Sequence, residues 1–80
     1  MYFLYVLRSL STGKFYIGQT ADVDKRLVRH NRGEMRSTKA GVPWELVHVE
    51  SFVTRSEAVR RERHLKSPQG WMELREIKKK

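Results

Sequence analysis

The first 19 residues, MYFLYVLRSLSTGKFYIGQ, determine the fold that the sequence predicts. Residues 1–8 form a near-continuous apolar run with aromatic and β-branched side chains, which is typical of a strand at the centre of a sheet. The polar segment at residues 9–13 predicts a turn, and residues 14–19 predict a second strand. Because the connection is short, we expect the two strands to form an antiparallel hairpin.

The middle of the chain predicts a helix, a loop and a third strand. Residues 22–32 predict the helix, which Thr20 or Asp22 can cap and which Gly33 ends. A polar, glycine-containing loop follows, and the apolar residues of segment 44–53 predict the strand.

Two further helices are predicted at the C-terminal end. The pattern Thr54-x-x-Glu57 is a capping box, so it predicts the start of a long helix. Ser67 and Pro68 are expected to end that helix and to start another over residues 68–78, with Ser67 as its cap. Its apolar side is expected to consist of Trp71, Leu74 and Ile77.

Composition predicts a single domain over residues 1–80 that binds a polyanion. The chain has 17 basic and nine acidic side chains, a net charge of +8. Its isoelectric point is about 10.3. Such a field attracts phosphate chains, so nucleic acid is the expected partner. Charge alone also fits an unspecific solubility role or association with ribosomes.

Other classes of protein are disfavoured by what the sequence lacks. It has no cysteine, which rules out disulfide bonds and thiolate metal sites. No apolar run reaches the ~18 residues of a membrane span, and residues 1–8 do not have the order of a signal peptide. We therefore expect a cytoplasmic protein with no membrane or disulfide partner.

A carboxylate in an apolar helical stripe is the first chemical clue. At about 100° per residue, Glu62 shares one arc of its helix with Ala58, Val59 and Leu65. A carboxylate that faces the core needs a cation, which a metal, Arg26 or another arginine can supply. The alternative is a structural ion pair at the edge of the stripe. The rest of this helix is expected to present basic side chains to the phosphates of a nucleic acid, namely Arg60, Arg61 and Arg63, with Lys66 near the boundary.

Arg26 and His30 form the second clue, because residues four apart on a helix are neighbours. Both are expected to lean toward the sheet, where an arginine can bind a phosphate oxygen and a histidine can exchange a proton. Tyr16 lies two residues before Gly18, which is expected to leave the sheet surface bare beside the tyrosine hydroxyl. Taken singly, Arg26 and His30 are better explained by structural roles, and aromatic residues in strands usually belong to the core.

Taken together, these residues resemble the pattern of the GIY-YIG nuclease family. Tyr5 keeps only the tyrosine of the first motif, since that element here is Phe3-Leu4-Tyr5, whereas Tyr16-Ile17-Gly18 matches the second motif fully. Arg26, His30 and Glu62 follow in register. The resemblance spans about residues 2–67 and is to small, standalone members similar to the domain in excinuclease subunits.

The resemblance implies an α+β fold, with a three-stranded antiparallel sheet flanked by helices. It also implies a metal-dependent endonuclease that hydrolyses DNA, with structured or damaged DNA in repair among the candidate substrates. In that scheme Glu62 holds a single Mg²⁺ or Mn²⁺ ion, and Tyr16 takes a proton from the attacking water. Tyr5 orients that water or Tyr16, Arg26 stabilises charge on the phosphoryl oxygens, and His30 stabilises or relays the proton.

The alternative is a non-catalytic, basic nucleic-acid-binding module with the same fold. Retention of Tyr16 and Glu62 argues against it, because binding alone requires neither residue. The sequence leaves open whether DNA or RNA is bound, and it leaves the oligomeric state open.

Overall fold

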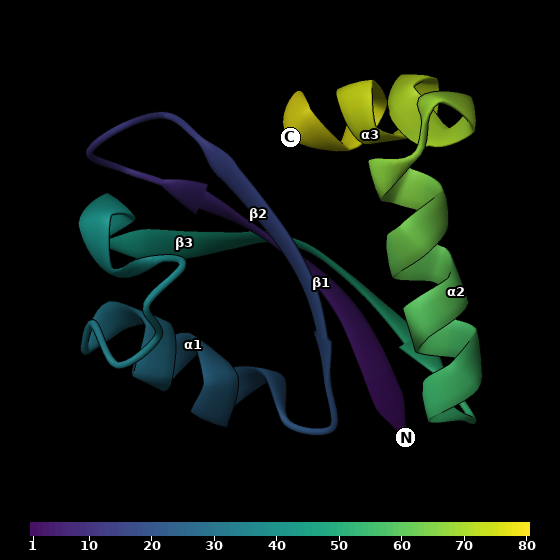
Figure 1. Ribbon diagram of the computed structural model, residues 1–80, viewed down its shortest axis with the longest axis horizontal. Helices are drawn as coiled ribbons and strands as arrows, with labels where there is room; N and C mark the ends of the chain where they lie inside the picture. Colours follow the sequence, from purple (N-terminus) through teal and green to yellow (C-terminus); the bar gives the residue numbers. More distant parts are fainter.

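A computed structural model describes residues 1–80 and contains one three-stranded sheet of order β2-β1-β3 (Figure 1). The strands are β1 (Tyr2–Ser9), β2 (Phe15–Thr20) and β3 (Trp44–Phe52). Both neighbours pair with β1 in antiparallel orientation, with Tyr5 opposite Gly18 in β2 and opposite Val49 in β3. The predicted hairpin and the predicted α+β class are therefore confirmed.

The helices are α1 (Val23–Asn31), α2 (Arg55–Lys66) and α3 (Trp71–Lys78). The side chain of Asp22, not that of Thr20, caps α1 by accepting a hydrogen bond from the Lys25 backbone. Two short 3₁₀ turns complete the structure, at Lys39–Gly41 and Pro68–Gly70. None of the helices has the length and apolar character needed to cross a membrane.

Alternate residues of β1 are buried on opposite faces of the sheet, as the period of a strand requires. Leu4 and Val6 pack with Ile17 against α2 and α3, whereas Tyr5 and Leu7 pack with Trp44 on the face that α1 covers. Figure 1 shows α1 and α2 on either side of the twisted sheet. The central strand is thus buried on both sides, which explains its near-continuous apolar sequence.

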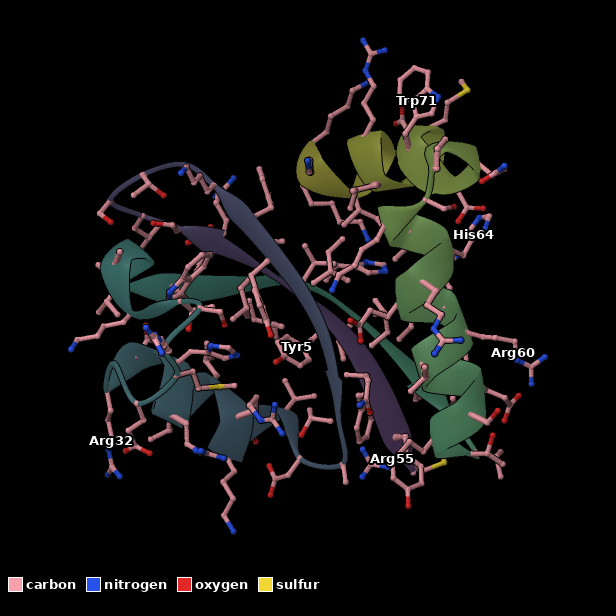
Figure 2. The ribbon with its side chains drawn as sticks, viewed as in Figure 1. Tyr5, Arg32, Arg55, Arg60, His64 and Trp71 are labelled. Atoms are coloured by element: carbon pink, nitrogen blue, oxygen red, sulfur yellow. The ribbon has the colours of Figure 1, made fainter.

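The C-terminal helix differs from its predicted start. Helix α3 begins at Trp71, after the 3₁₀ turn, and the Ser67 hydroxyl donates a hydrogen bond back to the His64 carbonyl rather than capping α3. Of the expected apolar side, Ile77 is buried, but Trp71 is 53% exposed and points outward (Figure 2). Pro68 is therefore the first residue of a 3₁₀ turn, as expected for a proline in a first helical turn, and this turn leads directly into α3 at Trp71.

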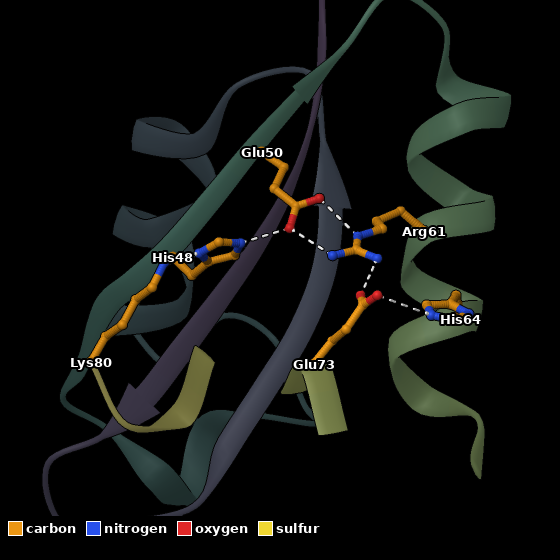
Figure 3. Close-up of polar contacts among 6 residues, drawn as sticks. All are labelled: His48, Glu50, Arg61, His64, Glu73 and Lys80. Atoms are coloured by element: carbon orange, nitrogen blue, oxygen red, sulfur yellow. Dashed lines mark hydrogen bonds and ion pairs between the residues drawn. The ribbon is translucent and has the colours of Figure 1, made fainter. Parts of the chain in front are cut away.

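A polar network holds α2 and α3 against β3 (Figure 3). The Arg61 guanidinium donates to both carboxylate oxygens of Glu50, at 2.8 and 3.2 Å, and also to Glu73 of α3. His48 donates to Glu50 at 2.7 Å and accepts from the Lys80 ammonium at 2.7 Å. Hydrogen bonds from Arg61 and His48 lower the pKa of Glu50 despite its partial burial.

The capping box at the start of α2 generates the first prediction. Thr54 accepts from the Glu57 backbone at 3.2 Å, and the Glu57 side chain accepts from the Thr54 backbone at 3.1 Å. We expect Thr54→Ala to lower the free energy of unfolding by about 1 kcal/mol, because the helix loses a cap. Urea unfolding followed by circular dichroism measures this change. Ser56→Ala, at an exposed position in the first turn of α2, is the control and should stay within about 0.5 kcal/mol of the parent. Equal effects from the two variants would contradict the capping role.

Candidate active site

A hydrogen-bonded chain of buried side chains forms the centre of the candidate site. The Tyr5 hydroxyl lies 2.9 Å from His30 Nε2, and His30 Nδ1 lies 2.7 Å from Thr38 Oγ1. All three residues are at most 1% exposed. These hydrogen bonds join the central strand, α1 and the loop before β3, so they fix the positions of three separate segments.

The pKa shifts of Tyr5 and His30 indicate which of these hydrogen-bonded groups carry protons. Burial, with the charges of Tyr16 and Glu62, raises the pKa of Tyr5 to about 12, so its hydroxyl stays protonated at neutral pH. Burial, with the charges of Arg26 and Arg29, lowers the pKa of His30, so its ring is neutral. We therefore assign Tyr5 as the donor to Nε2 and Nδ1–H as the donor to Thr38, whose hydroxyl is 3.4 Å from the Met35 carbonyl.

Gly18 is required for this arrangement. A Cβ atom at Gly18 would lie 2.6 Å from the Tyr5 hydroxyl oxygen and 3.1 Å from a ring carbon of Tyr16. The sequence-based expectation of a bare surface here is wrong, because the Tyr5 ring from the paired strand fills the space above the glycine. Glycine is needed so that Tyr5 can reach across β2 to His30.

Tyr16 lies beside these hydrogen-bonded side chains but takes no part in their hydrogen bonds. Its ring centroid is 5.0 Å from that of His30 and 6.2 Å from that of Tyr5, with both rings tilted against it. The residue is half-buried, and its hydroxyl makes no hydrogen bond within the protein. Of the two tyrosines, Tyr16 is therefore the one whose hydroxyl is available to a water molecule or a substrate.

Arg26 and Glu62 both act on Tyr5, from helices that lie on opposite sides of the sheet (Figure 1). Arg26 on α1 is half-buried, and it acts on the Tyr5 phenol to lower the pKa of that group. Glu62 on α2 acts in the opposite direction and raises the pKa of Tyr5. Of the five residues that the sequence singled out, the fold thus brings the rings of Tyr5, Tyr16 and His30 into contact, and it places Arg26 and Glu62 where each acts on Tyr5.

The cation beside Glu62 is Lys66, whose ammonium lies 2.7 Å from the carboxylate one helical turn away. Neither a buried Glu62 nor an arginine partner is observed, since the Glu62 side chain is 24% exposed at the edge of the stripe. No group of three or more histidine, aspartate or glutamate side chains surrounds it. A single carboxylate suits Mg²⁺, which commonly binds through one or two carboxylates, substrate phosphates and water.

The outward basic residues of α2 divide into two pairs. Arg61 and Lys66 do not extend freely into solvent as expected, because Arg61 is bound by Glu50 and Glu73 and Lys66 is bound by Glu62. Arg60 and Arg63 are exposed and make no ion pair. Both line an open groove of about 620 Å³ on the outer side of α2, where Arg60 projects from the helix (Figure 2).

Sequence reasoning missed Thr38 and Trp44 as parts of the site. Thr38 receives the hydrogen bond from His30, and the Trp44 ring packs edge-on against Tyr16 at 6.4 Å. Thr38 lies in an irregular loop, where no periodic pattern reveals which side chains are buried. The run Ser37-Thr38-Lys39 indicated only a loop.

Comparison with known proteins gives consistent matches along the chain. The family model described as the GIY-YIG catalytic domain matches residues 1–73. A UPF0213 protein of Halobacterium salinarum is 42% identical over 67 residues, covering 82% of this chain and 86% of that protein. A UPF0213 protein of Staphylococcus aureus is 38% identical over 80 residues, covering 99% and 96%. The solution structure of a UPF0213 protein from Bacillus halodurans superposes with a TM-score of 0.55 at 31% identity, covering 96% and 85%.

The two tyrosines should differ in their effect on stability. Tyr5→Phe leaves His30 Nε2 buried without a partner, which we expect to cost about 1–3 kcal/mol of unfolding free energy. Tyr16→Phe removes a hydroxyl with no internal partner and should change stability by less than about 0.5 kcal/mol. Denaturant unfolding of both variants measures the difference. A Tyr5→Phe variant as stable as Tyr16→Phe would show that the buried hydrogen bond is not formed.

Stability should also depend on pH through His30. Because the pKa of His30 is lowered in the fold from its usual 6.5, the unfolded chain binds more protons below that pH. The free energy of unfolding should therefore fall as the pH drops below about 6.5, by at most about 1.4 kcal/mol per pH unit. Unfolding curves between about pH 5 and pH 8 measure this slope. His30→Gln should flatten the slope, whereas His64→Gln, at a half-exposed position on α2, should not.

Proposed function

The chain belongs to the GIY-YIG nuclease family, and we propose that it is a metal-dependent endonuclease that hydrolyses phosphodiester bonds in DNA. One observation carries the proposal. A buried hydrogen bond from Tyr5 to His30 holds Tyr5 against Tyr16, and Arg26 and Glu62 act on the Tyr5 phenol with opposite charge. A fold that served only to bind a polyanion has no need of a buried tyrosine–histidine hydrogen bond beside a phenol without an internal partner.

Tyr16 carries the proton transfer in this proposal. Its hydroxyl has no partner within the protein, so it can hydrogen bond to the attacking water. In the phenolate form, Tyr16 would accept the proton that the water releases and become the neutral phenol. Tyr5 is a positioning residue, because its hydroxyl is already committed to His30 and its pKa is raised to about 12. His30 holds Tyr5 in place and is not a relay for Tyr16, since it is fully buried and bonded to Tyr5 and Thr38.

Arg26 and the metal ion that Glu62 would hold both stabilise negative charge on the phosphate in this proposal. The planar guanidinium of Arg26 suits two phosphoryl oxygens, and its charge stabilises the negative charge that develops there in the transition state. Glu62 would hold one Mg²⁺ or Mn²⁺ ion after parting from Lys66. When bound, the ion polarises the scissile phosphate and neutralises the leaving oxygen.

The proposed partner is DNA, which the net charge of +8 attracts without regard to sequence. Arg60 and Arg63 are the α2 side chains that remain free to contact phosphates away from the scissile one. Arg61 and Lys66, which were expected to share this role, are held by carboxylates within the chain.

Cleavage of a labelled oligonucleotide, with and without Mg²⁺, tests the proposal. We expect Glu62→Gln to abolish metal-stimulated cleavage and Tyr16→Phe to reduce cleavage by about 100-fold or more, the scale of a lost proton-transfer group. Neither change alters side-chain shape greatly, so DNA affinity and stability should be retained. Glu76→Gln, a charge change on the exposed side of α3, should cleave like the parent.

If the parent protein binds DNA but cleaves no single-stranded, branched or duplex DNA with Mg²⁺ or Mn²⁺, the chain is a binding module with the family fold. Cleavage by Glu62→Gln at the parental rate would instead remove Glu62 from the metal role.

A further inference from the structure

A small pocket lies beside Tyr16, between the β1–β2 turn and the 3₁₀ turn before β3. Its volume is about 200 Å³, and its lining includes Lys14, Tyr16, Ser37, Ala40, Gly41 and Trp44. We propose that this pocket binds one unstacked nucleobase of the DNA strand that is cut. This inference rests on the proposed function, because it assigns the substrate class of the same site.

The walls of the pocket are aromatic and held in place. The rings of Tyr16 and Trp44 meet at 65° with their centroids 6.4 Å apart. The Trp44 indole donates a hydrogen bond from Nε1 to the Thr38 carbonyl at 2.8 Å, and Gly41 packs on the indole so closely that no Cβ fits between them. Trp44 is 7% exposed and supports Tyr16 from the interior, so the half-buried Tyr16 ring is the surface on which a base can stack. Such stacking does not depend on the identity of the base, because every base has a π-face.

One basic side chain lines the pocket and others lie next to its lining in the sequence. Lys14 lines the pocket, is exposed and makes no ion pair. Arg36 and Lys39, which flank the lining residues Ser37 and Ala40 in the loop, are likewise exposed and unpaired. Hydroxyl groups of Thr12 and Ser37 line the same hollow. An aromatic interior with a cationic rim complements a base joined to a phosphate, and it does not complement an uncharged apolar ligand.

The size of the pocket limits its occupant. Sites for drug-sized molecules measure about 300–1,000 Å³, so a pocket of about 200 Å³ suits one planar ring system. A base inside a duplex is stacked on both faces and paired along one edge, and it cannot enter the pocket without leaving the helix. The pocket therefore favours DNA with an unpaired nucleotide, or a single strand, over continuous duplex.

Tyr16 connects the pocket to the chemistry. The same ring that lines the pocket also packs against Tyr5 and His30 in the candidate site. A base held against this ring places its own flanking phosphate within a short distance of the Tyr16 hydroxyl. Recognition of an unstacked base would thus position the phosphodiester bond for attack.

Titration with a mononucleotide tests the pocket without any cleavage. The probes are thymidine 5′-monophosphate and 2-deoxyribose 5-phosphate, followed by NMR of the isotope-labelled full chain. We expect the nucleotide to shift the indole N–H signal of Trp44 and the amide of Gly41, while the exposed Trp71 serves as an internal reference. The sugar phosphate should bind about 5-fold to 100-fold more weakly, the loss of one base–aromatic stack.

Filling the pocket should have the same effect as removing the base. Ala40→Trp places an indole in the hollow. We expect it to weaken the binding of thymidine 5′-monophosphate by about 10-fold or more, while the affinity for 2-deoxyribose 5-phosphate stays unchanged. Ser37→Phe enters from the neighbouring position and provides a second filling variant if Ala40→Trp does not fold. Ala21→Trp, at an exposed position beside the separate hollow that Phe3 and Val23 line, is the matched control and should bind like the parent.

Distinct outcomes separate this inference from the proposed function. Equal affinity for the two probes, or nucleotide shifts that persist in both filling variants, would overturn the base pocket even if the parent cleaves DNA. Shifts of Trp44 and Gly41 on dilution of the free protein, lost in Ala40→Trp, would also overturn it and assign the hollow to a second copy of the chain. Selective nucleotide binding by a parent that cleaves nothing would keep the pocket and remove the nuclease.

Discussion

The hydrogen bond between the Tyr5 hydroxyl and His30 Nε2 is the contact on which the other parts of the site depend. It spans the interior from the central strand to α1, so it is possible only if no side chain stands between them at Gly18. It also sets the tautomer of His30, which then donates to Thr38 and anchors the loop before β3. The free hydroxyl of Tyr16 follows from the same arrangement, because His30 has no further nitrogen to offer.

Local signals made the fold predictable from the sequence. The apolar run of β1, the turn after it and the capping box at Thr54 each depend on residues close in the chain, and the structure contains all three. Contacts between distant segments were not predictable. The space above Gly18 is filled by Tyr5 from the paired strand, and nothing in the sequence near Gly18 indicates this.

The orientation of Arg61 shows a second limit of sequence reasoning. Helical periodicity placed it outside the apolar stripe, where a basic residue normally faces solvent. In the structure, Arg61 turns toward β3 because Glu50 and Glu73 together supply carboxylate oxygens for it. A residue at the border of a stripe takes the direction of its strongest partner, and that partner lies on another element.

Ion pairs determine which parts of the surface carry unneutralised positive charge. Carboxylates neutralise many basic groups locally, as Glu34 does for Arg29 and Arg32 and as Glu62 does for Lys66. Exposed pairs of this kind contribute little to stability, but they remove charge from the surface that they occupy. The charge left over belongs to residues without such partners, and several of them surround the Tyr16 side of the sheet, namely Lys14, Arg26, Arg36 and Lys39.

Strand order also affects folding, because β1 pairs with β2 across a short turn but meets β3 only through distant residues, with Tyr2 opposite Phe52. Because pairing of distant segments costs more loop-closure entropy, we expect the closing of this long segment to be the slower part of assembly. Any fluctuation that releases β3 exposes the edge of an apolar strand while the hairpin persists, and such an edge is a template for strand-to-strand aggregation.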